Sequence, residues 1–268
     1  MIKDITLGQY FPGDSVIHRM DPRMKIILTL IYIISLFLVR SFWGFLVTGI
    51  LLIATIAISR IPIKTVLKGI KPLLFIIIFT AFFNIFYGVG PAVFPNVGWL
   101  SWLTWGGLRN AAFMAVRIIL LITGTSFMTY TTSPVMLTDA MERLMSPLKY
   151  LKVPVHELSM MMTIAMRFIP TLIDETEKIT NAQKARGADF ETGNIIRRAK
   201  ALIPILIPLI VSAFRRAEEL ADAMECRRSN GGDGRTRYKT YNFSLRDYVA
   251  ALIIIASLAA VIVINIYV

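Results

Sequence analysis

Two short segments that each have an arginine at or next to their last residue are the part of this sequence best suited to binding chemistry. AQKARG occupies residues 182–187 and AMECRR occupies residues 223–228, which places Arg186 and Arg227 forty-one positions apart. At the same offset, Ala182 matches Ala223 and Glu177 matches Glu218. A planar guanidinium can donate paired hydrogen bonds to a carboxylate or bind a carbonyl oxygen. The segments therefore indicate two narrow, positively charged helix ends.

The position of each arginine admits two interpretations. Arginine in the last turn of a helix complements the exposed carbonyl groups there, by about 0.3–1 kcal/mol, and Gly187 is a typical residue for ending the first helix. Both arginines could thus cap their helices in solvent. The small residues Ala182, Ala185 and Ala223 equally suit a thin tip that enters a groove on a partner. Spacing alone leaves both interpretations open.

Motifs for catalysis or cofactor binding are missing from the chain. The sequence contains no GxxxxGK[ST] phosphate loop, no HExxH pair and no CxxC, and its histidines, His18 and His156, are far apart. Its one cysteine, Cys226, allows no disulfide within the chain and is interpreted as a small residue. We therefore expect no enzyme, cofactor or metal, and interpret the acidic clusters at 174–177 and 218–219 as salt-bridge partners.

Composition places the chain in a bilayer. It is 56% hydrophobic with a mean hydropathy of +0.64, against about 45–50% apolar residues in soluble domains. Uncharged runs at 41–59, 72–108, 118–138 and 248–268 are long enough to span, and 26–39 is a shorter fifth candidate. Residues 201–214, with Pro204 and Pro208, suit an interfacial or packed helix. The predicted fold is an all-α integral membrane protein with about five transmembrane helices.

The distribution of charge predicts the topology. The net charge is +12, and 26 of the 29 lysines and arginines lie on one side if the N-terminus is cytoplasmic and the C-terminus is outside. The positive-inside rule explains this distribution without nucleic acid as a partner. We expect a multi-pass protein of the cell membrane, with residues 1–130 forming a four-span region, residues 131–244 a cytoplasmic helical region, and residues 245–268 the last span.

Three predictions concern the parts within these regions. Residues 131–244 should contain three amphipathic helices. The first covers about 134–149, the second begins at about 155 and is kinked at Pro170, and the third covers about 205–227. Arg117, inside a span, either serves function or pairs with a carboxylate or carbonyl; both remain open. Trp99, Trp102 and Trp105 recur every three residues and suit the headgroup layer, with substrate stacking as an alternative.

At this point the sequence resembles a known family, the transmembrane T component (EcfT) of energy-coupling-factor (ECF) transporters. The resemblance rests on GQYFPGDSVIHRMDPRMK at 8–25 together with KARGADF and AMECRR, and it covers almost the whole chain. It implies long cytoplasmic coupling helices whose Ala-Arg-Gly motifs dock on two ABC-type ATPase subunits. It also implies that a separate small membrane subunit captures a vitamin or similar micronutrient.

The two tips match the family motif to different degrees. Ala185, Arg186 and Gly187 match it fully, whereas Cys226, Arg227 and Arg228 retain only the central arginine. Without glycine at its stop, the second helix is expected to extend toward residues 231–232. The resemblance assigns these six residues to ATPase binding. The alternative function is a self-contained permease or channel with its own substrate path.

Overall fold

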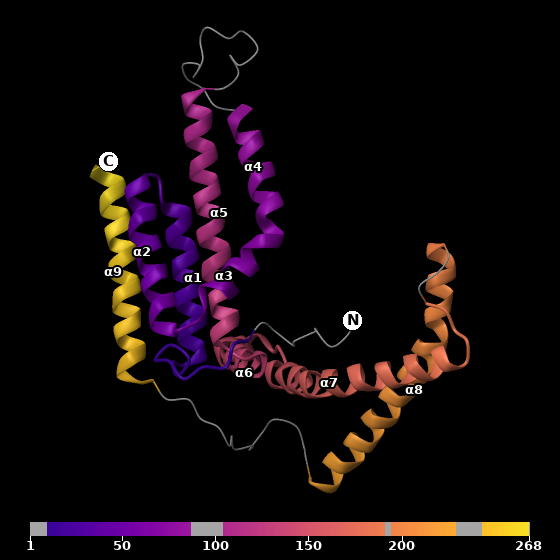
Figure 1. Ribbon diagram of the computed structural model, residues 1–268. Helices are drawn as coiled ribbons and strands as arrows, with labels where there is room; N and C mark the ends of the chain where they lie inside the picture. Colours follow the sequence, from indigo (N-terminus) through magenta and orange to yellow (C-terminus); the bar gives the residue numbers. More distant parts are fainter. Residues whose placement is uncertain (1–9, 87–103, 191–193, 229–242, 268) are drawn as a thin grey trace. The chain divides into compact units, whose positions relative to one another are not determined.

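A computed structural model describes residues 10–86, 104–190, 194–228 and 243–267 (Figure 1). The elements in these ranges are helices, which confirms the predicted all-α fold. They are α1 (Pro22–Leu38), α2 (Phe42–Ser59), α3 (Ile63–Ile70), η1 (Lys71–Leu73), α4 (Leu74–Phe86), α5 (Trp105–Thr131), α6 (Pro134–Met145), η3 (Ser146–Leu151), α7 (Val155–Ala185), α8 (Ile195–Cys226) and α9 (Leu245–Tyr267).

The chain divides into two compact units. Among the described residues, the membrane unit comprises 10–86, 104–137 and 243–267, and the α7–α8 unit comprises 138–190 and 194–228. Within the described residues, four stretches are long and apolar enough to cross a bilayer: Phe42–Ser59, Ile63–Ile85, Trp105–Thr131 and Leu245–Tyr267. All four belong to the membrane unit. The 17-residue α1 packs beside them, so a fifth span remains a prediction.

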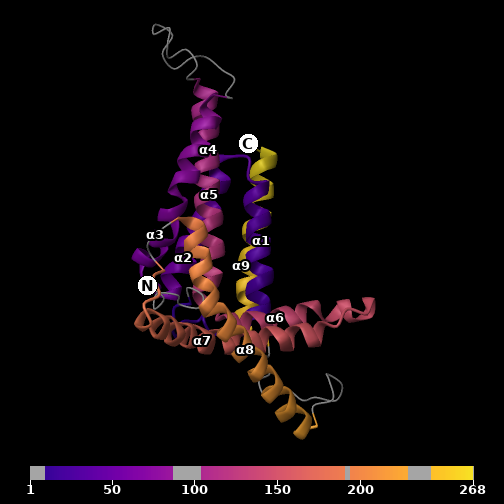
Figure 2. The same ribbon diagram turned by 90° about the vertical axis from the view of Figure 1, so that its right-hand side faces the viewer.

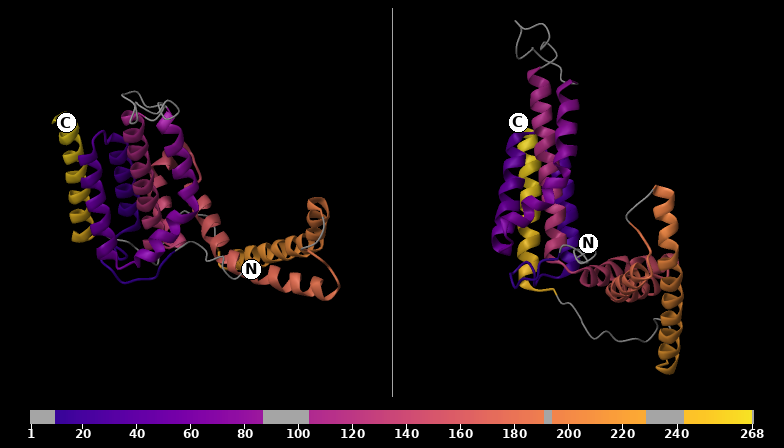
Figure 3. Two further views of the ribbon diagram at one scale, coloured as in Figure 1. Left: turned by 45° about the horizontal axis from the view of Figure 1, so that its top comes forward. Right: turned by 45° about the vertical axis from the view of Figure 1, so that its right-hand side comes forward.

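The membrane unit has a four-helix arrangement at its centre. Both α1 and α2 pack against α5 and α9, while α4 runs along α5 (Figures 1 and 3). The buried core contains Leu36, Val39 and Val261, which have no exposed surface, together with Tyr32, Phe45 and Leu52. Two glycines allow close approach: a Cβ at Gly107 would collide with the carbonyl oxygen of Ile85, and one at Gly124 with the Tyr32 ring.

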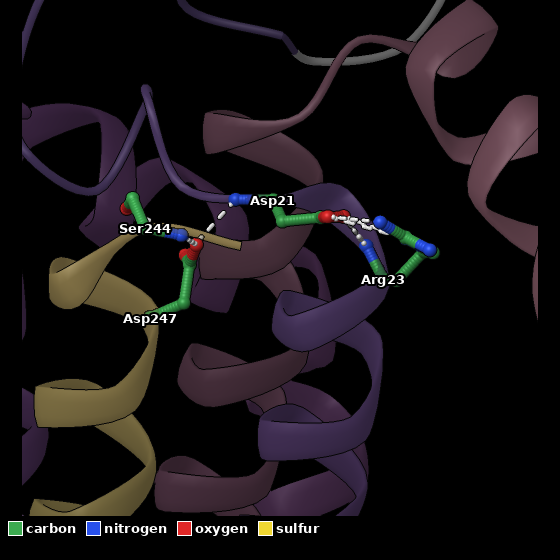
Figure 4. Close-up of polar contacts among 4 residues, drawn as sticks. All are labelled: Asp21, Arg23, Ser244 and Asp247. Carbon is green, nitrogen blue, oxygen red and sulfur yellow. Dashed lines mark hydrogen bonds and ion pairs between the residues drawn. The ribbon is translucent and has the colours of Figure 1, made fainter. Parts of the chain in front are cut away.

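A network of buried carboxylates ties the first residues of α1 to those of α9 (Figure 4). The Asp21 carboxylate accepts a hydrogen bond from the backbone N–H of Arg23 at 2.9 Å and pairs with the Arg23 guanidinium at 2.7 Å. Asp247, 1% exposed, accepts from the backbone N–H groups of Ser244 at 2.8 Å and Asp21 at 3.1 Å. An aspartate followed by proline is typical of a helix start, and Asp21 does cap α1. Asp247 joins two helix ends that are distant in sequence.

Arg117 pairs with a backbone carbonyl at the opposite end of this bundle. Its guanidinium donates to the carbonyl oxygen of Val39 at 2.7 Å and lies 5.7 Å from the centre of the Phe45 ring. Asn265 of α9 binds the same turn, donating to the carbonyl of Leu38 at 2.7 Å and accepting from the Arg40 N–H at 3.2 Å. This geometry favours the structural interpretation of Arg117.

Several predicted boundaries differ from the structure. The third helix predicted for residues 131–244 begins at Ile195, not near residue 205, because Pro204 and Pro208 are accommodated inside a continuous α8. The basic stretch at 60–71, which lies between two of the uncharged runs, contains α3. The run at 118–138 belongs mostly to α5, which begins at Trp105. Trp99 and Trp102 lie outside the described residues, and Trp105 is 59% exposed.

We predict that Asp247→Ala destabilises the membrane unit, because two backbone N–H groups lose their buried acceptor. Each unsatisfied group costs about 1–3 kcal/mol. The midpoint of thermal unfolding in detergent should therefore fall measurably, and Asp247→Asn, which keeps one acceptor oxygen, should give an intermediate value. Asp222→Ala, which removes an exposed acid from α8, is the control. An unchanged midpoint for Asp247→Ala would contradict the role of the carboxylate.

Candidate functional site

The first tip is a glycine-terminated helix end. Helix α7 ends at Ala185, Arg186 is the cap residue, and Gly187 has φ +89°. The N–H of Gly187 donates to the carbonyl of Lys184 and that of Ala188 to the carbonyl of Gln183, both at 3.0 Å. This is the Schellman pattern, which satisfies the last carbonyls of a helix. Ala185, Arg186 and Gly187 are all exposed, so the guanidinium is free to meet a partner.

The second tip reaches a similar geometry without glycine. Helix α8 ends at Cys226, and Arg228 takes the left-handed conformation at φ +53° while its N–H donates to the carbonyl of Glu225 at 2.8 Å. The predicted extension toward residues 231–232 is therefore wrong, although those two residues lie outside the described ranges. The turn satisfies the last carbonyls, and arginine adopts this conformation at a cost of about 1–2 kcal/mol. Cys226, Arg227 and Arg228 are exposed.

Helices α7 and α8 cross within their unit (Figures 1 and 2). Near the crossing, the Arg216 guanidinium donates to the Glu175 carboxylate at 2.7 Å, and the Ser212 hydroxyl donates to the same carboxylate at 2.5 Å. Apolar side chains from both helices line the adjoining contact: Ile164, Phe168, Leu172, Ala217, Leu220 and Met224. The predicted salt-bridge role of the 174–177 cluster is confirmed at Glu175.

The two residues of the ion pair, Glu175 and Arg216, are forty-one positions apart, as are the tip arginines Arg186 and Arg227. Arg186 follows Glu175 by eleven residues, and Arg227 follows Arg216 by eleven residues. Each tip therefore lies ~16 Å along its helix from the ion pair, at about 1.5 Å per residue. Since the end of α8 packs toward Ile164 and Phe168, on the other side of Glu175 from Arg186, the two tips lie on opposite arms of the crossing. This shared spacing is the feature of the sequence that could have indicated the pairing of Glu175 with Arg216.

Both histidines make local hydrogen bonds. His18 bonds with the Ser15 hydroxyl at 2.7 Å and with the carbonyl of Phe11 at 3.1 Å, and burial lowers its pKa below the ordinary value. His156 of α7 contacts the Glu142 carboxylate at 3.0 Å, and the Ser159 hydroxyl donates to the same carboxylate at 2.7 Å. Glu142 thereby joins α6 to α7. Across the described ranges, no group of three or more His, Cys, Asp or Glu residues could hold a metal ion.

Comparison with known proteins is consistent with this arrangement. The family model described as "Cobalt transport protein" (CbiQ) matches residues 13–238. The chain is 55% identical over 247 residues to a protein of Ruminiclostridium cellulolyticum, with 92% of each chain covered, and 53% identical over 255 residues to one of Clostridium kluyveri, with 94% and 93% covered. A Bacillus subtilis protein is 42% identical over 261 residues, with 96% and 98% covered.

All three relatives are named energy-coupling factor transporter transmembrane protein EcfT. This chain belongs to the EcfT family. The resemblance inferred from the three sequence motifs is thereby confirmed, and the apolar helices together with the family place the chain among multi-pass membrane components of transporters. The names of these relatives do not assign roles to the individual tip residues.

We predict opposite effects of two substitutions on the helix ends. Gly187→Ala forces a side chain into a left-handed conformation, although a Cβ there would meet no atom within 4 Å. Arg228→Gly relieves the same strain, about 1 kcal/mol, at the second tip. Hydrogen–deuterium exchange near residues 185–188 should accelerate about fivefold in the first variant, and exchange near 225–228 should slow in the second.

Lys152→Gly is the matched control for these variants. Lys152 has φ +61° at the end of η3, so this substitution changes a left-handed residue in another turn. Exchange at both tips should be unaffected by it. If Gly187→Ala exchanged like the unmodified chain, the glycine would not be needed to end α7.

Proposed function

We propose that this chain is the membrane scaffold of an ECF-type importer, coupling ATP hydrolysis by two ABC-type ATPase subunits to a separate substrate-binding membrane subunit. The observation that carries the proposal is the pair of exposed arginine tips on opposite arms of the α7–α8 crossing. Two tips with equivalent geometry suit two ATPase subunits. The family name of the relatives supports an energy-coupled transporter, and the sequence has no phosphate loop of its own.

Docking assigns a role to each of the six tip residues. Arg186 and Arg227 insert their guanidinium groups into a groove on each ATPase subunit, where carboxylates or carbonyls accept their hydrogen bonds. Ala185 and Cys226 keep the tips narrow. Gly187 and Arg228 turn the chain away from the helix axis, so that the following residues clear the groove. In this arrangement residues 131–244 and the N-terminus are cytoplasmic.

The substrate-binding subunit requires a different surface. Over residues 202–214 of α8, large apolar side chains are 48–69% exposed; they are Leu202, Ile203, Leu206, Ile207, Ile210, Val211 and Phe214. On α7, Met161 and Met162 are more than half exposed. Flexible methionine-rich faces can repack against different partners. We propose that these surfaces and the membrane spans hold a subunit that captures a vitamin or similar micronutrient.

The crossing converts ATPase movement into movement of this surface. Because the ion pair and apolar contact join α7 to α8, a force on one tip reaches the other helix through the crossing. Closure of two nucleotide-bound ATPase subunits would draw the arms together. The apolar surface at residues 202–214 belongs to the same continuous helix as the arm that ends at Arg227. It would therefore tilt with that arm and with the bound subunit.

The alternative, a self-contained permease, requires polar groups facing a substrate path. Arg117 binds the Val39 carbonyl, and the Asn84 amide donates to the Thr80 carbonyl at 2.9 Å in its own helix. These interactions favour structural roles for both residues. The alternative predicts transport by the reconstituted chain alone, whereas the scaffold requires stoichiometric ATPase subunits.

We predict that Arg186→Glu combined with Arg227→Glu releases the ATPase subunits from the membrane. Loss of one member of a buried charge pair at an interface costs about 2–5 kcal/mol. Affinity purification followed by quantitative mass spectrometry would measure the retained ATPase. Arg167→Glu with Arg215→Glu makes the same charge change at exposed positions of the same helices and should retain the complex. Full retention and uptake in the tip variant would refute docking through the arginines.

We predict that breaking the crossing uncouples hydrolysis from transport. Glu175→Ala leaves the Arg216 guanidinium without its carboxylate, so the arms should move independently while the ATPase subunits remain bound. In proteoliposomes of the complete complex, the amount of substrate transported per ATP hydrolysed should fall. The charge-reversed pair, Glu175→Arg with Arg216→Glu, should recover part of the loss. An unchanged transport ratio in Glu175→Ala would show that the pair does not transmit force.

A further inference from the structure

The membrane unit is tightly packed at one end and hollow at the other. Around Leu36, Val39 and Val261 the helices leave no exposed surface. At the end where α1 and α9 begin and α5 finishes, the same four helices surround a cavity of about 370 Å³. This volume lies within the range of roughly 300–1,000 Å³ typical of small-molecule sites. Its wall includes Leu28, Thr55, Phe127, Met128, Val249 and Ile253.

The wall of this cavity offers few free polar groups to water. In the described structure the Tyr32 hydroxyl is buried in this wall without a hydrogen-bond partner, and most of the other polar groups are already bonded. A buried water needs two to four polar partners, roughly, to replace its bulk hydrogen bonds. The hydroxyls of Thr55 and Thr131 donate to carbonyls of their own helices, Leu51 at 2.6 Å and Phe127 at 3.1 Å. Lys25 donates to the carbonyl of Thr131 at 2.9 Å, and to the Thr132 hydroxyl and the His18 carbonyl at 3.3 Å each. Its ammonium group has therefore used its three donors.

The cavity is open toward the surroundings of the bundle. The wall residues Ile58, Val249 and Ile253 are 50–55% exposed, and Leu245 is 81% exposed. A membrane-spanning unit of this kind is surrounded by hydrocarbon chains at these positions. An apolar chain that entered would fill a space whose wall side chains otherwise lack dispersion contacts.

Positive charge gathers at the same end of the cavity. Arg246 belongs to the cavity wall, is exposed, and makes no hydrogen bond or ion pair with the part of the chain that the structure describes. It stands in the first turn of α9, where the helix dipole is also positive. Lys25 adds a second positive charge, although its three N–H donors are already used in hydrogen bonds. An anion beside Arg246 would therefore be attracted by the guanidinium, the helix end and the ammonium. The neighbouring Asp247 carboxylate opposes this attraction, although it is buried and already accepts hydrogen bonds from Ser244 and Asp21.

We propose that this cavity binds one acyl chain of an anionic glycerophospholipid from the adjacent leaflet, with the phosphate group beside Arg246. The apolar wall selects the hydrocarbon chain, and the unpaired guanidinium selects the anionic headgroup. Occupation would fill the hollow end of the bundle and link α9 to α1, α2 and α5 through the lipid. The site lies wholly within the membrane unit and is independent of ATPase docking.

Photolabelling of the full chain in phosphatidylcholine vesicles tests this site. Trace lipids carrying a diazirine on the acyl chain are added as phosphatidylglycerol, as phosphatidylcholine, or as free palmitic acid, and labelled peptides are mapped by mass spectrometry. Phosphatidylglycerol should label cavity residues such as Leu28 and Val249 about fivefold more than phosphatidylcholine, because one arginine near a headgroup contributes about 1 kcal/mol. Free palmitic acid, whose carboxylate could also meet Arg246, should label the cavity less than phosphatidylglycerol.

Two variants separate the charge from the apolar wall. Arg246→Gln should reduce phosphatidylglycerol labelling to the phosphatidylcholine level, while Arg40→Gln, which removes an exposed arginine at the other end of the bundle, should not. Ala250→Phe fills the cavity and should abolish labelling there for every lipid. Retained labelling of the exposed Phe75 and Phe79 on α4 verifies folding, and Ala250→Leu replaces the variant if it fails to fold.

Three results would overturn the proposal. Equal cavity labelling by both phospholipids would remove the anionic selectivity. Stronger labelling by palmitic acid than by phosphatidylglycerol would identify a free fatty acid as the occupant. Labelling confined to the outer surface of α4 and α9, with Leu28 unlabelled, would show that no lipid chain enters.

Discussion

The ion pair between Glu175 and Arg216 is the interaction on which the geometry of the α7–α8 unit depends. A carboxylate that accepts from both Ser212 and Arg216 sets where two long helices meet. The two arms have equal length because the pair and the arginine tips share one offset in sequence. An ion pair whose side chains remain 33% and 21% exposed adds little stability by itself, so its value lies in fixing the crossing rather than in holding the fold together.

The need of backbone carbonyl groups for hydrogen-bond donors explains why both tips have the same form despite different sequences. The last carbonyls of a helix need partners, and the left-handed turn supplies them whether the residue is Gly187 or Arg228. Glycine adopts that turn without strain, and arginine adopts it at a cost. The second tip therefore places two adjacent arginines at its end beside Glu225, whereas the first has Lys184 and Arg186 and no acidic residue, and the second tip also stores some conformational strain. In the proposed assembly, the two ATPase grooves would meet tips of unequal charge.

The membrane unit uses polar residues for attachment between helices. Asp21 and Asp247 join α1 to α9 at one end, and Arg117 and Asn265 bind the turn between α1 and α2 at the other. Each of these polar side chains forms a hydrogen bond with a backbone group. The bond offsets the cost of removing the side chain from water, which allows it to lie in an apolar environment. Between these two attachments the helices pack through apolar side chains and close glycine contacts, except where the cavity opens.

Local patterns in the sequence were sufficient for the helical membrane fold, the Asp21 cap, the start of α7 and the stop at Gly187, because each depends on residues within a turn or two of one another. They did not predict that Pro204 and Pro208 lie inside α8. For the end of α8 they gave both about residue 227 and an extension toward residues 231–232, and the structure, with the end at Cys226, agrees with the first. Glu175 rather than Asp174 pairs with Arg216, Arg117 meets the Val39 carbonyl, and Asp247 meets Asp21 only in the folded chain. Tertiary structure decided these contacts because the choice among equivalent partners depends on which helices pack together, and that is a long-range property of the chain.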